Sequence, residues 1–244
     1  MDYNAQFFGA TKANHFWFRS RTDFWEWLLK KGLHNKTLAQ QLKILYLGSG
    51  IGDDLEMFKP YGDVYALDLD QKTLDMIPNH LVKEKVCADA CAIPYKNNFF
   101  DAVVAFDILE HIPDHNKAAA EVKRVLKEDG TLIFTVPAFE QLTSSHDRMT
   151  GHVRRYNKPI IRLLLKDFKQ DTLGYWFFSL FGLAALQRFI TKNSTNNDYY
   201  QQKLPKFIHS SLYRIMTFEN WLIKKGLSFP WGLTIYGIYH NKSS

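Results

Sequence analysis

A glycine-rich segment near residue 50 has the residue types that bind a nucleoside. An apolar run, 44–47, leads directly into Gly48-Ser49-Gly50-Ile51-Gly52. Glycines let a backbone approach a bound molecule closely, and free amides at the start of the following helix can bind its polar groups. A second apolar run ends at Asp68, and a carboxylate about 20 residues after such a turn can accept both hydroxyls of a ribose. The two segments together predict a nucleoside site.

A second group of polar side chains lies in residues 144–156, where histidine, aspartate, arginine and tyrosine occur close together. A histidine, alone or paired with Asp147, can take a proton from a hydroxyl nucleophile. Arg154 and Arg155 can clamp a carboxylate or a phosphate. The alternative is structural, with the arginines pairing with Asp147 or capping backbone carbonyls. We predict a chemical role, and the catalytic candidates are His146, His152, Arg155 and Tyr156.

Short apolar runs that alternate with helix-like segments must position these groups. The expected strands are 43–47, 63–68, 85–87, 100–106, 131–136, 172–177 and 232–239. The expected helices are 15–31, 53–59, 71–77, 117–126 and 205–225. Near-continuous apolar strands that alternate with helices predict an α/β fold, a mostly parallel sheet covered on both faces. The ligand groups then gather at the carboxyl edge of the sheet.

Five segments in this order resemble the class I S-adenosylmethionine-dependent methyltransferases. They are the glycine turn at 48–52, the strand end at Asp68, the CADA segment at 87–90, FFDAVVAFDILEHI at 99–112 and VLKEDGTL at 125–132. The resemblance implies a Rossmann-like sheet of seven strands, with helices on both faces and an antiparallel last strand. It implies S-adenosyl-L-methionine as cofactor and S-adenosyl-L-homocysteine as product.

The resemblance also implies which residues hold the cofactor. These are Gly48, Ser49, Gly50, Gly52, Asp68, Leu69, Asp89, Ala90, Asp107, Ile108 and Leu109. The chain departs from the family at Tyr46, where an acid usually helps to orient the methionine end. Asp53 or Asp54 could replace that acid, or they could simply stabilise the helix start through its dipole.

Residues 146–156 resemble an HDxxxGHxRRY segment of a bacterial subgroup of this family. The subgroup shares an aromatic stretch like 15–21 and a C-terminal pattern like 229–232. We therefore expect a single domain over 1–244. It would have an N-terminal helical cap at 1–40, a cofactor-binding core at 41–137 and an acceptor-side part at 138–244. A helical insertion at about 178–228 would precede the last strand.

Metal and disulfide chemistry is not expected. Asp107, Glu110 and His111 have the spacing that holds a cation in ubiquinone-pathway O-methyltransferases, but the LEH triplet is also common in metal-free relatives. We predict no metal site. Cys87 and Cys91 are expected to be small core residues. Two cysteines cannot form a disulfide framework, which favours a reducing, cytoplasmic location.

The net charge of +6 is unevenly placed. Residues 1–140 hold 16 Lys and Arg against 20 Asp and Glu, whereas residues 141–244 hold 15 against 5. A basic, aromatic C-terminal part predicts an anionic or amphiphilic acceptor, either a small molecule or a lipid-linked one, methylated on oxygen. Residues 172–187 carry no charge. They are too few to span a bilayer, but they could contact the inner face of the membrane.

Two other functions remain as alternatives. Net positive charge would also suit a nucleic-acid methyltransferase. That class typically has a (D/N)PP(Y/F) turn or a Pro-Cys nucleophile, and this chain has Asp107-Ile108-Leu109-Glu110 at the corresponding place. A non-catalytic cofactor-binding protein is the other alternative, because of Tyr46. The sequence leaves the oligomeric state open.

Replacing Asp68 by alanine tests the predicted ribose contact. We expect Asp68→Ala to weaken S-adenosylmethionine binding by about 1–3 kcal/mol, because a partly buried acceptor of two hydroxyls is lost. Isothermal titration calorimetry measures the change. An unchanged affinity would contradict the ribose assignment.

Overall fold

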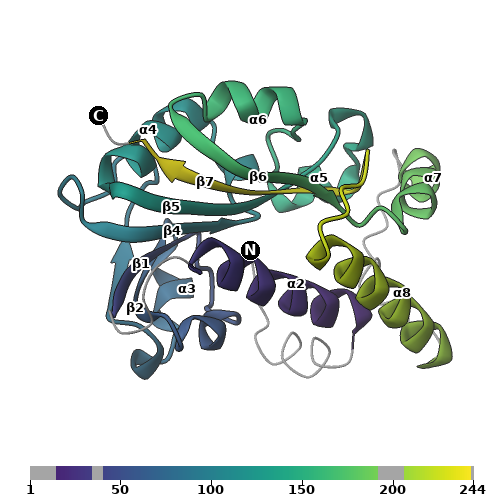
Figure 1. Cartoon of the computed structure of the whole chain (residues 1–244), viewed down its shortest axis with the longest axis horizontal. Coiled ribbons are helices and arrows are strands. Elements are labelled where there is room, and N and C mark those ends of the chain that lie inside the picture. Colours follow the sequence, from purple (N-terminus) through teal and green to yellow (C-terminus); the bar gives the residue numbers. More distant parts are fainter. Residues whose placement is uncertain (1–14, 35–40, 192–205, 243–244) are drawn as a thin grey trace.

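A mixed sheet of seven strands runs through the middle of the computed structural model, which describes residues 15–34, 41–191 and 206–242 (Figure 1). Its order is β3-β2-β1-β4-β5-β7-β6. The strands are β1 (Leu42–Leu47), β2 (Gly62–Asp68), β3 (Glu84–Cys87), β4 (Phe100–Phe106), β5 (Leu126–Pro137), β6 (Phe168–Trp176) and β7 (Thr234–Asn241). β7 pairs antiparallel with both β5 and β6, and the remaining pairs are parallel. The predicted fold class is confirmed.

Helices cover both faces of this sheet (Figure 1). They are α2 (Phe16–Gly32), α3 (Gln71–Asp75), α4 (His115–Val125), α5 (Ser145–Thr150), α6 (Lys158–Leu164), α7 (Phe181–Thr191) and α8 (Lys206–Lys224). Alternate residues of the buried strands enter two separate cores: Ile44 and Val104 pack on the α2 side, and Leu45 and Val103 on the α4 side. This arrangement explains the near-continuous apolar strands, because both of their faces are buried.

Stacked aromatic rings join the N-terminal helix to the C-terminal part. Trp17 stacks on Phe177 with ring centroids 3.9 Å apart, and Phe24 stacks on Trp176 at 4.1 Å. The indole nitrogen of Trp176 donates to Asn220 Oδ1 at 2.8 Å. Helix α2 therefore packs along α8 (Figure 1).

The helical insertion lies where it is expected, and its two helices are α7 and α8. Residues 192–205 within it fall outside the described part of the chain. No helix in the described ranges is long and apolar enough to cross a membrane. The proposed division of the chain into cap, core and acceptor-side part stays a prediction.

Several elements differ from the sequence-based expectation; among them, α5 was not expected, and β5 begins at Leu126 rather than at residue 131. The predicted helix at 53–59 is only a 3-10 turn, η1 (Leu55–Phe58), because β2 begins at Gly62 and leaves no room for a longer helix. Helix α6 was not expected, although Asn157 caps it through Ile160 N and Pro159 occupies its first turn. The sixth strand begins at Phe168 rather than at residue 172, since its polar first half pairs with β7.

Glu219 of α8 holds the turn after β6 and offers a test of this packing. Its carboxylate is 2% exposed and accepts from the backbone N–H groups of Phe178 and Ser179, both at 2.9 Å, and from the Ser179 hydroxyl. We expect Glu219→Ala to lower the free energy of unfolding by about 2–4 kcal/mol, because two backbone N–H groups and a hydroxyl lose a buried, charged acceptor. Chemical denaturation measures the loss, with the exposed Glu128→Ala as the matched control. Equal stability of the two variants would refute this role of Glu219.

Candidate functional site

The glycine turn after β1 is held against the end of β2. The amides of Gly48 and Ser49 donate to Leu67 O at 2.8 and 3.1 Å. The amide of Gly50 donates to Asp68 Oδ2 at 2.8 Å. Gly48, Gly50 and Gly52 have φ angles of +71°, +52° and +76°. Residues other than glycine rarely adopt this backbone conformation. The sequence motif and the Asp68 carboxylate therefore form one unit, as the spacing predicts.

Two observations show that this turn fits a bound molecule. A Cβ added at Gly50 would meet no atom of the described residues within 4 Å, so the space over this residue is open. The hydroxyl of Ser49 is buried, and it has no hydrogen-bond partner within the described ranges. By contrast, a Cβ at Gly48 would lie 2.3 Å from Ile108 Cγ1, so that glycine allows β1 and the β4 end to approach. Open space beside an unpaired buried hydroxyl suits a polar ligand.

The predicted adenosine contacts lie beside Asp68. Leu69 is 75% exposed, which leaves an apolar side chain available to cover a planar ring. Asp89 Oδ1 accepts from Cys91 N at 2.8 Å and shapes the turn that contains the buried Ala90. The core placement was wrong for Cys87, which is exposed because the edge strand β3 is incompletely covered, whereas Cys91 is half-buried and packs against the α4-side core.

Tyr46, which replaces the usual acid, lies in a cluster of charges. It is buried and packs on Phe58, with ring centroids 5.0 Å apart. Burial, followed by the negative charge of Asp54, raises the pKa of the Tyr46 hydroxyl well above its ordinary value. Arg21 of α2 reaches the same cluster, and its Nη2 lies 3.9 Å from Asp54 Oδ2. Arg21 was not predicted as a site residue, and only the folded chain shows that α2 brings a cation to the glycine turn.

The end of β4 forms the wall opposite the glycine turn. Asp107 has a φ of +50°, and its Oδ1 accepts from Thr135 Oγ1 at 2.8 Å. The backbone then turns through η3 (Leu109–His111), where the Leu109 side chain is buried in the α4-side core. Ile108 meets Gly48, whereas Leu109 supports the wall from behind. The assignment of all these side chains to the cofactor stays a prediction.

Asp147 organises the acceptor-side loop. Its buried carboxylate accepts from both the amide and the hydroxyl of Ser144, at 2.8 Å each, which caps the short helix α5. The same carboxylate contacts His152 Nδ1 at 2.9 Å and Arg155 Nη2. His152 remains partly exposed, while its ring orientation is set by Asp147. This arrangement leaves Nε2 of His152 for contact with an acceptor.

The arginines and the tyrosine of this loop have structural contacts. Arg154 donates to the carbonyls of Ile112 and Pro113 at 2.8 and 2.6 Å. Arg155 is buried and divides its guanidinium between Asp147 and Ala138 O. Tyr156 is 1% exposed, and its hydroxyl donates to Leu109 O at 3.0 Å. Arg155 and Tyr156 are thus buried and bonded within the fold, and their assignment as catalytic residues stays a prediction. The side chain of His146 lies outside what the structure describes.

His152 meets the end of β4 at Glu110 and His111. The rings of His111 and His152 lie 4.7 Å apart, and Val153 N donates to Glu110 O at 2.9 Å. Burial, followed by the neighbouring His152, lowers the pKa of His111, while the charges of Asp107 and Asp68 act against this shift. The loop therefore places His152 beside the same strand end that faces the glycine turn.

Glu110, His111 and His152 also have the chemistry to hold a cation. One ligand atom from each lies within 4.8 Å of the others, and a carboxylate with two imidazoles suits a divalent transition metal. This set differs from the predicted spacing, since His152 stands in place of Asp107. The expectation of a metal-free site stays a prediction.

Known proteins share both the motif region and the fold. A family profile described as "Methyltransferase domain" matches residues 45–134. The N-methyltransferase NodS from Bradyrhizobium japonicum, solved in complex with S-adenosyl-L-homocysteine, has a TM-score of 0.56 at 13% identity, over 93% of this chain and 88% of its own. Residues 45–134 thus form a methyltransferase domain of the class I, S-adenosylmethionine-dependent type. The bacterial-subgroup assignment of the 146–156 segment is not confirmed by these matches.

Other similar proteins match this methyltransferase over different lengths. The YcgJ protein from Bacillus subtilis has a TM-score of 0.59 at 16% identity, over 89% of this chain and 98% of its own. The ubiquinone/menaquinone biosynthesis C-methyltransferase UbiE of Cronobacter sakazakii is 31% identical over 125 residues, 46% of this chain and 50% of UbiE. An uncharacterized protein of Methanocaldococcus jannaschii is 32% identical over 145 residues, 59% of each. The chain thus spans about half the length of these two curated relatives.

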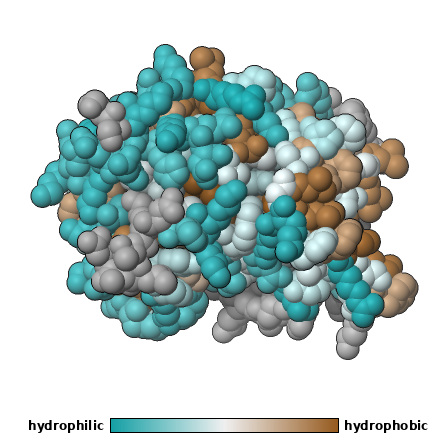
Figure 2. Space-filling model, viewed as in Figure 1, coloured by the Kyte–Doolittle hydropathy of each residue, from teal (hydrophilic) through white to brown (hydrophobic). Residues whose placement is uncertain are grey.

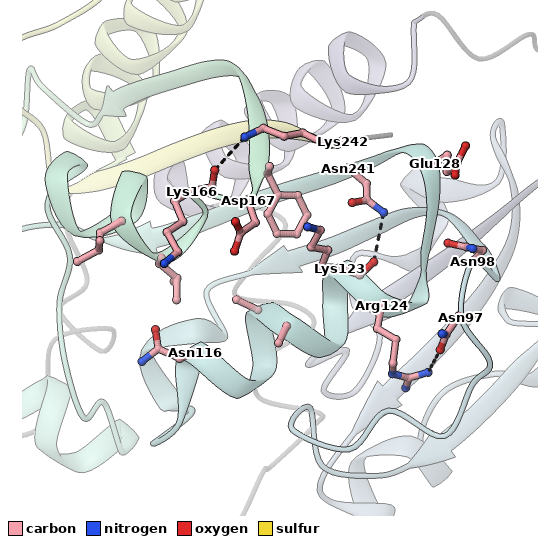
Figure 3. A pocket seen from close by; sticks show the side chains of 15 residues that line it. Asn97, Asn98, Asn116, Lys123, Arg124, Glu128, Lys166, Asp167, Asn241 and Lys242 are labelled. Atoms are coloured by element: carbon pink, nitrogen blue, oxygen red, sulfur yellow. Dashed lines mark hydrogen bonds between the residues drawn. The ribbon is translucent and has the colours of Figure 1, made fainter. Parts of the chain in front are cut away.

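A groove of about 620 Å³ lies at the opposite end of the methyltransferase sheet, where β6 begins and β7 ends (Figure 3). Asn241 lines this groove, and its side-chain amide donates to the carbonyls of Lys123 and Leu126 at 3.2 and 3.1 Å. Lys242 Nζ donates to Lys166 O at 3.1 Å. The lining groups are largely engaged with one another, and the glycine turn lies at the other edge of the sheet. We assign the methyltransferase site to the glycine turn and not to this groove.

The buried carboxyl of Glu110 gives a pH-dependent test of the site. Burial, followed by repulsion from Asp107, raises its pKa well above the ordinary 4.5. Ionised Glu110 therefore destabilises the folded state, and stability is lost as the pH rises from about 4.5 through the raised pKa of the folded state. The difference in free energy of unfolding between Glu110→Gln and the natural chain should therefore grow in favour of the variant as the pH rises from acidic to alkaline values.

Denaturant unfolding at several pH values measures this difference. The exposed Glu128→Gln serves as the control and should give a difference that is flat across the same range. A difference for Glu110→Gln that is equally flat would show that Glu110 ionises normally in the folded chain.

Proposed function

We propose that this methyltransferase transfers a methyl group to a hydroxyl of an anionic or amphiphilic acceptor, either a small molecule or a lipid-linked one. The observation that carries the proposal is the His152–Asp147 pair, with Nδ1 and Oδ1 2.9 Å apart, held beside the strand end that faces the glycine turn. A pair of this kind can deprotonate a hydroxyl, whereas an amine or a carbanion acceptor needs a different base or none.

The glycine turn supports S-adenosyl-L-methionine as the cofactor. The open space at Gly50 and the unpaired Ser49 hydroxyl accept a polar ligand, and Asp68 lies beside them. NodS, which has the same fold, was solved with S-adenosyl-L-homocysteine. In the proposed complex the Asp68 carboxylate accepts from the ribose hydroxyls, Leu69 covers the adenine, and Arg21 offers a cation to the methionine carboxylate. The bound cofactor supplies an electrophilic methyl carbon.

The residues of this chain then have to orient the acceptor and take its proton. Asp147 accepts from His152 Nδ1 and so presents His152 Nε2 as the base. Nε2 takes the hydroxyl proton while the oxygen forms its bond to the methyl carbon and the carbon–sulfur bond breaks. The half-buried His111 has a lowered pKa, so a neutral imidazole lies beside the charge that develops on His152. Alignment of the acceptor supplies the remaining rate increase.

Carbon methylation is the second candidate, since UbiE, which is 31% identical over 125 residues, is named as a C-methyltransferase. A nucleic-acid acceptor is less well supported, because Asp107 leads into Leu109-Glu110-His111 and not into a base-binding (D/N)PP(Y/F) turn. A non-catalytic cofactor-binding role would leave the His152–Asp147 pair without a purpose.

Replacing His152 tests the proposed base. We expect His152→Ala to lower turnover by on the order of 10²-fold or more, because proton transfer loses its base, and to leave S-adenosylmethionine affinity unchanged. Membrane-lipid and small-molecule extracts incubated with methyl-labelled cofactor provide the assay, and mass spectrometry of the labelled product locates the methyl group. The exposed His80→Ala, on η2 (Asn79–Leu81), is the control.

Four outcomes would count against the proposal. Full turnover by His152→Ala would remove the base assignment. Label on carbon would favour carbon methylation. Label in the nucleic-acid fraction would favour a nucleic-acid methyltransferase. Failure of the natural chain to bind S-adenosylmethionine in calorimetry would leave only a non-enzymatic role.

A further inference from the structure

The outer face of helix α8 carries large apolar side chains that face solvent. Phe207 is 71% exposed, Phe218 60% and Trp221 51%. Phe218 and Trp221 stack on each other, with ring centroids 5.8 Å apart. Figure 2 shows hydrophobic side chains gathered on the part of the surface where α7 and α8 lie in Figure 1. Such a cluster of exposed aromatic rings marks an interaction site.

These side chains form one stripe along the helix. Phe207, Phe218 and Trp221 recur at multiples of the three- and four-residue spacing, as do Arg214 and Lys225 just beyond the helix end. The opposite face holds Met216, Glu219 and Asn220, which are buried against the rest of the chain. Helix α8 therefore has one face packed against the rest of the chain, partly through the polar Glu219 and Asn220, and exposes large apolar side chains on the other face.

The charges on this outer surface, named here the α8 surface, all have one sign. Among the described residues from 207 to 231, the exposed charged side chains are Arg214, Lys224 and Lys225. The sole acid in that range is Glu219, which is buried and bonded to the turn after β6. Aromatic rings flanked by cations, without exposed acids, complement an anionic, amphiphilic surface.

Neighbouring segments extend the α8 surface. Leu183 and Leu186 are exposed on α7, three residues apart and so on one side of that helix. Leu227 and Trp231 are exposed in the segment between α8 and β7. Phe181 at the start of α7 contacts Phe139, with ring centroids 5.7 Å apart, directly before η4 (Glu140–Leu142). The apolar surface thus continues towards the acceptor-side loop.

We propose that the α8 surface docks the protein on an anionic lipid bilayer. Phe218 and Trp221 enter the boundary between headgroups and acyl chains, and Arg214, Lys224 and Lys225 contact lipid phosphates. The binding is a property of the surface and does not depend on the chemistry assigned above, although it would bring a lipid-linked acceptor to α7 and the loop behind it. A second copy of the chain fits this surface poorly, because a symmetric contact would oppose like charges.

Vesicle co-sedimentation tests the proposal on the full chain. Phosphatidylcholine vesicles with and without phosphatidylglycerol are the probes. We expect the protein to bind the vesicles that contain phosphatidylglycerol at least about tenfold more tightly, and the preference to fall as salt increases. A tryptophan fluorescence shift to shorter wavelength should accompany binding, since Trp221 leaves water.

Two variants separate the apolar and the charged contributions. Phe218→Ser with Trp221→Ser should lower vesicle affinity at least about tenfold, because the buried apolar area is lost. Arg214→Gln with Lys224→Gln and Lys225→Gln should abolish the preference for phosphatidylglycerol. Leu163→Ser, an exposed leucine on α6, and Lys96→Gln are the matched controls and should bind as the natural chain does. Circular dichroism and S-adenosylmethionine binding confirm that each variant is folded and that the cofactor site is intact.

The remaining outcomes would overturn the proposal. Equal binding to both kinds of vesicle, or binding that none of the variants changes, would exclude docking by this surface. Concentration-dependent self-association in light scattering that Phe218→Ser with Trp221→Ser removes would assign the surface to a second copy. Binding to a labelled nucleic-acid duplex without binding to vesicles would assign it to nucleic acid.

Discussion

The buried carboxylate of Asp147 is the group on which the acceptor side of the fold depends. It caps helix α5 through Ser144, sets the ring of His152 and neutralises Arg155. A buried charge without such donors would strongly destabilise the folded state, so the loop path and the imidazole orientation are determined together. Val153 N then bonds to Glu110 O and connects the loop to the β4 end. One carboxylate thus determines where a base can meet an acceptor.

The cofactor side could be predicted because its signals are local. Gly48, Gly50 and Gly52 follow an apolar strand directly, and all three adopt positive φ angles. Asp68 ends the next strand and bonds to Gly50 N. Parallel neighbouring strands bring their carboxyl ends together, so residues 20 apart in sequence become neighbours once the sheet is recognised. The antiparallel last strand followed from the same resemblance, whereas the strand order is known only from the structure.

The acceptor side could be predicted only as a set of residue types. An arginine in the sequence does not show which group accepts its hydrogen bonds, and Arg154 and Arg155 prove to bind carbonyls and Asp147 rather than an outside anion. Arg21 is more than 30 residues from Asp54, and only the packing of α2 on the sheet brings them together. Helix α6 was overlooked because its seven residues give too short a pattern to separate from a loop.

The charge asymmetry of the chain takes on a different meaning in three dimensions. The excess of +10 in residues 141–244 suggests an anion held by the acceptor-side loop. Two of the three arginines of that loop, Arg154 and Arg155, are bonded inside the protein to backbone carbonyls, whereas Arg148 is exposed. The positive side chains that face outward instead include Arg214, Lys224 and Lys225 on and after α8, next to exposed aromatic rings. Loop arginines that are bonded within the protein and lysines that are exposed on the surface therefore differ in the ligands they can reach.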